Sequence, residues 1–76
     1  MRHSVMEVAV SLMNQRKFSK AITLLESRRE NYEENFDYYL TLGIACLYAG
    51  DIGNASRYFQ KARAIRLTDS RLLLGQ

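Results

Sequence analysis

The chain of 76 residues contains no proline, only four glycines, one cysteine and one histidine. A chain without proline and with few glycines has few residues that interrupt a helix, which favours an all-helical protein with short turns. The single cysteine, Cys46, excludes a disulfide within the chain and provides no cysteine cluster for a metal. The single histidine, His3, is interpreted as a solvated residue near the N-terminus. We therefore expect no metal and no cofactor.

Long apolar runs and catalytic patterns are also missing. No stretch approaches the roughly 18 consecutive apolar residues of a membrane-spanning helix, and Glu7 interrupts the apolar run that follows the N-terminus. The sequence therefore predicts no membrane span, no signal peptide and a cytoplasmic location. The four glycines are scattered and form no phosphate-binding loop. The acidic residues at 30, 33, 34 and 37 have no apolar pocket around them that would raise a carboxyl pKa. We expect no catalytic residue and no enzymatic activity.

What the sequence does contain is a regular pattern between Tyr39 and Ala62. Apolar or small residues recur at intervals of three and four, which places them on one face of each of two helices. The first helix carries Tyr39, Leu42, Gly43 and Cys46, and the second carries Ala55, Phe59 and Ala62. Gly43 lets a second helix approach closely. Between the two helices, Gly50 fits a helix C-cap and Asp51 fits the next N-cap.

This arrangement of residues resembles the signature of the tetratricopeptide repeat, a helix–turn–helix unit. An earlier and weaker copy precedes it by one repeat length, since Val8, Ala9, Leu12, Ala21 and Leu25 stand in the places of Leu42, Gly43, Cys46, Ala55 and Phe59. Phe18 is expected to seat the second helix of that earlier copy. The resemblance implies repeat one at residues 2–35 and repeat two at residues 36–69. It leaves residues 70–76 as the start of a further helix.

The sequence thus predicts an all-α fold, a single domain over residues 1–76. The resemblance implies antiparallel helix–turn–helix repeats stacked as a short right-handed solenoid. We expect helices at residues 4–15, 19–32 and 37–49, and a fourth from 52 to 65 or 67. Family members commonly end the second helix at a proline, where this chain has Leu67. Thr68, Asp69 and Ser70 then resemble an N-cap for the further helix.

The first helix of each repeat is apolar on nearly all sides, so it is expected to be buried on more than one side. In tetratricopeptide proteins these helices line a concave groove, and the resemblance places an apolar stripe there: Met6, Val10, Met13, Leu40, Ile44, Leu47 and Tyr48. Such a groove suits an amphipathic helix or an extended peptide of another protein. The alternative is that neighbouring repeats or a second copy of the chain bury this stripe as core.

Family members that hold the C-terminal carboxylate of heat-shock chaperones use lysine and asparagine in this groove. The matching places here hold Met6, Val10 and Thr41, so we do not expect that class of partner. The function favoured by the sequence is therefore a non-enzymatic scaffold or adaptor that binds protein. The rival hypothesis is a structural segment that self-associates into a homo-oligomer through a leucine-rich tail, which consists of Leu72, Leu73 and Leu74.

Charge supports a third hypothesis. Residues 1–38 hold six basic and six acidic residues, whereas residues 39–76 hold five basic and two acidic ones. Four of the basic residues form a predicted basic face on the last helix of repeat two: Arg57, Lys61, Arg63 and Arg66. Such a face is usually solvated, but it could bind an acidic protein or a nucleic acid. No motif of a DNA- or RNA-binding module accompanies these charges, so nucleic acid is not the expected partner.

Overall fold

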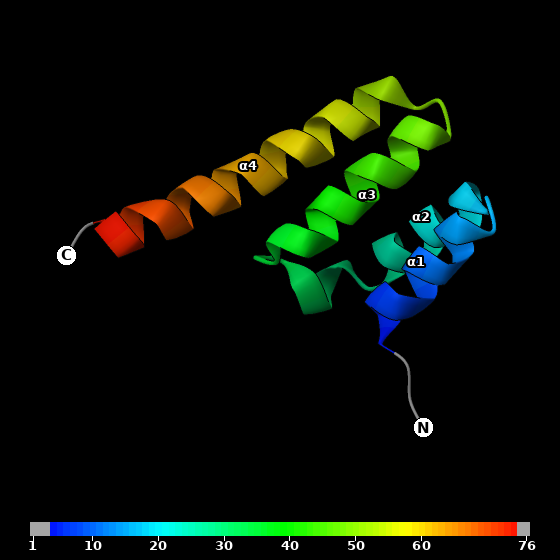
Figure 1. Cartoon of the computed structure of the whole chain (residues 1–76), viewed down its shortest axis with the longest axis horizontal. Coiled ribbons are helices and arrows are strands. Elements are labelled where there is room, and N and C mark those ends of the chain that lie inside the picture. The colour runs from blue at the N-terminus through cyan, green and yellow to red at the C-terminus, as the bar shows by residue number, and fades with distance from the viewer. Residues whose placement is uncertain (1–3, 75–76) are drawn as a thin grey trace.

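A computed structural model describes residues 4–74 of the chain, with side chains for residues 4–67. This part consists of helices and contains no strand (Figure 1). Its elements are α1 (Val5–Asn14), α2 (Phe18–Ser27), a short 3-10 helix η1 (Arg29–Tyr32), α3 (Phe36–Tyr48) and α4 (Ile52–Leu74). The predicted all-α class is confirmed. His3 lies outside the described residues.

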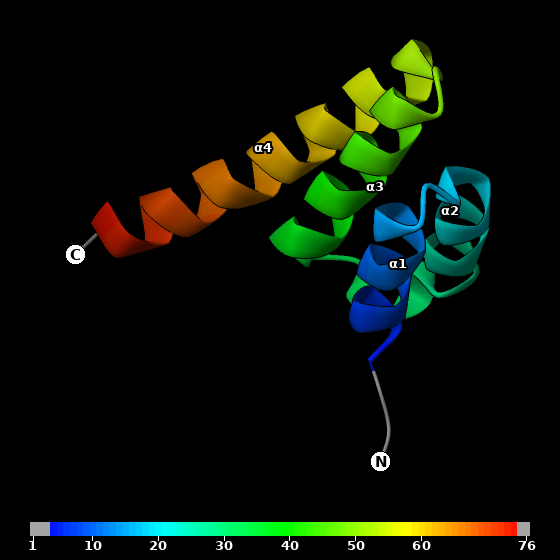
Figure 2. The ribbon, with the colours of Figure 1, turned by 45° about the vertical axis from the view of Figure 1, so that its right-hand side comes forward.

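The helices pack in the order of the chain. α1 lies against α2, α2 against α3, and α3 against α4, with a smaller contact between α1 and α3 (Figures 1 and 2). α3 is therefore the central helix, and six of its residues are buried. α1 is packed on one side only and has one buried residue, Ala9. The expectation that both helices would be buried on more than one side holds for α3 and is wrong for α1.

Polar side chains begin three of the four helices. Ser4 and Glu7 form a capping box at α1, in which the Glu7 amide donates to Ser4 Oγ at 3.1 Å and the Ser4 amide donates to Glu7 Oε1 at 3.3 Å. Asn35 accepts from the Tyr38 amide at 2.9 Å at the start of α3. Asp51 accepts from the Asn54 amide at 3.2 Å and so caps α4, as the sequence predicted.

The turns after α1 and α3 have the same geometry and stand at equivalent places of the two predicted repeats. After α3, Gly50 has φ +89° as expected for a C-cap, and the Asp51 amide donates to the Cys46 carbonyl at 2.8 Å. After α1, the equivalent residue Arg16 has φ +64°, and the Lys17 amide donates to the Leu12 carbonyl at 2.8 Å. Both turns are Schellman motifs. The first one could not be predicted from the sequence, because an arginine at this place gives no signal for a positive φ.

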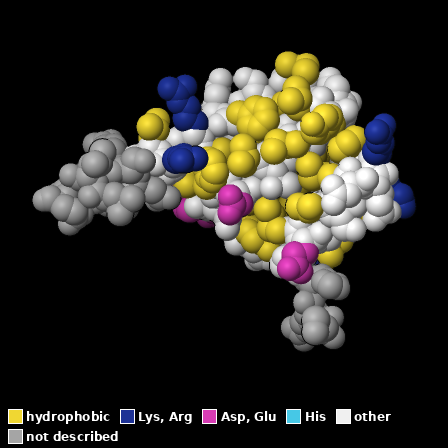
Figure 3. Space-filling view, in the orientation of Figure 1, with side chains coloured by type: hydrophobic (Ala, Val, Ile, Leu, Met, Phe, Trp, Pro, Cys, Tyr) yellow, Lys and Arg dark blue, Asp and Glu magenta, His cyan; other side chains and the backbone are white. Residues whose placement is uncertain are grey.

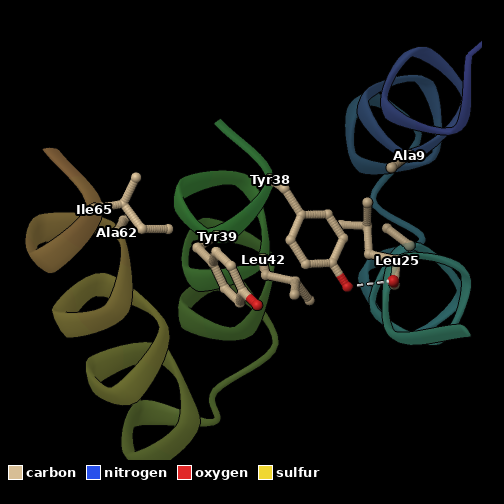
Figure 4. Close-up of a cluster of buried hydrophobic side chains, with 8 residues drawn as sticks. Ala9, Leu25, Tyr38, Tyr39, Leu42, Ala62 and Ile65 are labelled. Carbon is tan, nitrogen blue, oxygen red and sulfur yellow. Dashed lines mark hydrogen bonds between the residues drawn. The ribbon is translucent and has the colours of Figure 1, made fainter. Parts of the chain in front are cut away.

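The core includes residues of all four α-helices, from Ala9 of α1 to Ala62 and Ile65 of α4 (Figure 4). The largest side chains that are fully buried are Tyr38, Leu25, Leu42 and Cys46. Tyr38 points toward α2, where its hydroxyl donates to the Leu25 carbonyl and so satisfies a backbone group near the end of that helix (Figure 4). Its ring also stacks on the Tyr32 ring, with the centroids 5.1 Å apart.

Three expectations about packing and helix length are wrong. The helix expected over residues 19–32 ends at Ser27, and Arg29–Tyr32 form the separate 3-10 helix η1. Val8, placed with the core residues from its spacing, is 39% exposed, whereas its counterpart Leu42 is fully buried. Val8 is exposed because, among the described elements, α1 packs mainly on α2 and has only a small contact with α3. The separate helix expected after residue 70 is replaced by a continuation of α4 to Leu74. No proline interrupts α4, so the N-cap residues 68–70 do not end it.

Candidate functional site

The described residues offer no obvious chemical site. No three His, Cys, Asp or Glu side chains among them lie together as a metal site would require. Cys46 is buried, and this burial raises the pKa of its thiol. The four acidic residues near the start of α3 are all exposed, as expected for a solvated surface. None of the described helices has the length and apolar character that crossing a membrane would take.

The most prominent surface feature is a set of apolar side chains on the side formed by α1 and α3. Figure 3 shows hydrophobic side chains gathered into a band over α3 and the adjoining part of α1. Val10 is 44% exposed, Leu47 45% and Tyr48 67%, although all three are large apolar or aromatic residues. Three further residues of the predicted groove are half-buried and pack against the core: Met6, Met13 and Leu40. Ile44 is also half-buried.

Part of this predicted groove lines one cavity of about 640 Å³. Met13 comes from the end of α1, and Ile44 and Tyr48 come from the end of α3. Phe18, the first residue of α2, also lines the cavity, and its ring stacks on Tyr48 with the centroids 5.3 Å apart. The remaining lining residues are polar, Asn14 and Arg16. The structure therefore brings residues of three helices together here. Phe18 was predicted only as a packing residue.

Leu40 belongs to a different cavity. It lines a groove of about 360 Å³ between the start of α3 and the middle of α4, hereafter called the α3–α4 groove. The other lining residues are Phe36, Phe59, Ala62, Arg63, Arg66 and Leu67. The predicted stripe is thus divided, because Leu40 and Ile44 are one helical turn apart on α3 but contact different neighbours.

The predicted basic face is divided as well. Arg63 and Arg66 border the α3–α4 groove, whereas Arg57 and Lys61 line a third cavity of about 460 Å³. That third cavity, the polar cavity, lies between α2, η1, α3 and α4, and its other lining residues are Glu26, Arg29, Tyr39, Asn54 and Tyr58. The four residues therefore lie beside two different cavities, because the step of two residues from Lys61 to Arg63 carries the side chains about half a turn around α4.

A hydrogen-bonded tyrosine joins the two sides of the polar cavity. The Tyr58 hydroxyl donates to Glu26 Oε2 at 2.8 Å and accepts from Arg29 Nη2 at 3.0 Å. Burial and the hydrogen bond to Glu26 raise the pKa of Tyr58 to about 12. The Lys61 ammonium lies 5.7 Å from the centre of the Tyr39 ring. Glu26 and Arg29 are thus already joined through the Tyr58 hydroxyl. We therefore interpret this cavity as part of the packing between α2, η1 and α4.

The predicted self-association tail lies at the end of α4. Residues 72–74 are part of the α4 backbone, and their side chains lie outside the described part of the structure. Comparison of the chain with protein families, with curated proteins and with solved structures finds no match in any of the three.

Proposed function

We propose that this chain is a non-enzymatic protein-interaction module, a scaffold or adaptor built from two repeats of the tetratricopeptide type. Two Schellman turns, at Arg16 and Gly50, support the assignment of two repeats, because they have equivalent hydrogen bonds and lie one repeat length apart. Buried small residues recur at the same interval, since Ala9 corresponds to Gly43 and Ala21 to Ala55. Packing of each helix on the next is in keeping with a short solenoid.

The observation that carries the proposed function is the exposed apolar surface over α1 and α3. We define the concave surface as this set with the cavity that it borders: Val10, Met13, Phe18, Ile44, Leu47 and Tyr48. Apolar side chains that gather in one patch on a small protein mark an interaction site. A cavity of about 640 Å³ is large enough to receive several side chains of a partner. The occupant is an apolar segment of another protein, as an amphipathic helix or an extended peptide.

Selection of displayed peptides on the purified chain tests this proposal. We expect the selected peptides to carry apolar residues three and four apart if they bind as helices, and at alternate positions if they bind extended. Leu47→Ser should weaken their binding about fivefold or more, as expected for an interface residue whose truncation costs above about 1 kcal/mol. Ile52→Ser is the matched control, because Ile52 is 61% exposed on α4 and lies outside the concave surface.

Two results would contradict the proposed function. One is a selection that yields no apolar peptide. The other is equal loss of binding in Leu47→Ser and Ile52→Ser, which would place the contact elsewhere. Circular dichroism of both variants should match the parent chain, because each residue replaced is exposed.

Self-association through the end of α4 is a second candidate function. Leu67 is 54% exposed there, and α4 continues beyond it to Leu74. Sedimentation equilibrium over a wide concentration range tests it: changing Leu72 and Leu73 to Lys should dissociate the oligomer. A parent chain that remains a folded monomer at high micromolar concentration would reject this candidate.

A further inference from the structure

The α3–α4 groove lies on the second helix pair, α3 and α4, and the first pair, α1 and α2, shows what covers the equivalent surface. In the first pair, Leu25 of α2 is fully buried, and the Tyr38 side chain of α3 covers the end of α2 (Figure 4). The residue at the equivalent place of the second pair, Phe59 of α4, is only half-buried and lines the groove. The difference arises because α3 packs on the first pair, whereas no described element packs on the same side of the second. A helix is therefore the shape that fits this groove.

The length of α4 extends this surface. α4 has 23 residues and α3 has 13, so α4 runs about 15 Å further if both are regular helices. Figures 1 and 2 both show α4 continuing past the beginning of α3. A helix lying in the groove would therefore contact α3 on one side and α4 along its length.

Charge indicates which kind of helix fits. Arg63 and Arg66 line the groove, and no acidic residue lines it among those described. The Arg66 guanidinium lies 5.4 Å from the centre of the Phe36 ring, which holds this charge beside the apolar floor. Figure 3 shows basic side chains next to hydrophobic ones where α4 leaves α3. An apolar helix face bordered by Asp or Glu would complement both features.

A second copy of this chain fits the groove less well. A two-fold contact places the same patch of both copies together, so it would bring two pairs of Arg63 and Arg66 into proximity. A head-to-tail contact would instead offer α1 of the next copy. The acidic residue described in α1 is Glu7, and its carboxylate is already in the capping box with Ser4.

We propose that the α3–α4 groove binds an amphipathic helix of another protein, one whose apolar face is bordered by acidic residues. This site is separate from the concave surface and does not depend on it. Phe36, Leu40, Phe59 and Leu67 would contact the apolar face of the bound helix, and Arg63 and Arg66 would pair with its carboxylates.

Two designed peptides, each long enough to form a helix of several turns in water, test this proposal by fluorescence anisotropy. Both carry leucine and isoleucine on one helix face, and one has glutamate along the two edges where the other has lysine. We expect the acidic peptide to bind with a Kd of about 100 µM or lower and about tenfold more tightly than the basic one, as two ion pairs at the edge of a groove would give.

Charge reversal provides the decisive variant. The double change Arg63→Glu and Arg66→Glu should reverse the preference, so that the basic peptide binds more tightly. The matched control is Arg57→Glu with Lys61→Glu, which makes the same change in net charge beside the polar cavity and should keep the preference for the acidic peptide. Leu67→Ser should weaken binding of the acidic peptide, and Leu47→Ser on the concave surface should not.

Several outcomes would overturn the proposal. Equal affinity for the two peptides, no binding at about 1 mM, or reversal by the Arg57 and Lys61 variant would each do so. Loss of binding in Leu47→Ser alone would move the contact to the concave surface and leave the proposed function intact. Self-association that Leu67→Lys abolishes would assign the groove to a second copy of the chain.

Discussion

Replacing Gly43 with alanine tests the close approach of α3 and α4. Gly43 lies on the side of α3 that faces α4. A Cβ atom added at this position would lie 2.6 Å from Phe59 Cε1 and 2.7 Å from Phe59 Cδ1. These distances are shorter than van der Waals contact, so the Phe59 ring or the α4 backbone would have to move.

Two opposing effects set the size of the change. Overpacking a well-packed site costs about 1–3 kcal/mol, whereas replacing a helix-interior glycine with alanine gains about 1 kcal/mol in helix propensity. Gly43→Ala should therefore lower the free energy of unfolding by about 0–2 kcal/mol. Gly53→Ala is the matched control, because Gly53 also lies in a helix but no atom lies within 4 Å of its added Cβ. This control should gain up to about 1 kcal/mol.

The informative quantity is the difference between these two alanine variants. Urea unfolding followed by circular dichroism should show Gly43→Ala less stable than Gly53→Ala by about 1–3 kcal/mol. Adding Phe59→Leu should reduce the penalty of Gly43→Ala, because the shorter side chain leaves room for the new methyl group. If both alanine variants are stabilised equally, α3 and α4 do not approach each other as described and the reasoning fails.

Three further predictions concern single residues. Arg16→Gly should raise the free energy of unfolding by about 1 kcal/mol, because arginine is strained at φ +64° and glycine is not; denaturant unfolding measures this, and a destabilised variant would contradict the Schellman turn. The pKa of Tyr58 is raised from 10.0 to about 12 in the folded chain. The protonated Tyr58 hydroxyl therefore contributes to the free energy of unfolding fully below pH 10, and this contribution is lost as the pH rises toward 12. Tyr58→Phe should flatten that part of the stability profile, with a residual slope from Tyr38, whose pKa burial also raises; an unchanged slope would count against the hydrogen bond to Glu26. Cys46 should react with a thiol reagent at pH 8 much more slowly than a free cysteine, and urea should restore the rate, since the buried thiol has a raised pKa. Fast labelling of the native chain would show that α3 is not the central helix.

The division of the groove and of the basic face shows where reasoning from sequence spacing stops. Ile44 and Leu40 share a face of α3, as do Arg57 and Lys61 on α4, and the sequence was sufficient to place each pair. It could not show that Leu40 and Ile44 have different neighbours. Those neighbours come from α1, α2 and α4, and the angles between helices determine which of them meet.

The sequence by itself determined the local structure of this protein. Apolar residues three and four positions apart and the absence of proline predicted the four α-helices, although not the ends of α2 and α4. Gly50 and the cap at Asp51 predicted one of the turns, because these features act within a few residues of the chain. Tertiary structure decided the burial of each apolar residue. Val8 is exposed and Leu42 is buried, although they occupy equivalent places, because α3 has helices on both sides and α1 does not. Burial depends on neighbours that are distant in sequence, so the spacing of residues along the chain could not predict it.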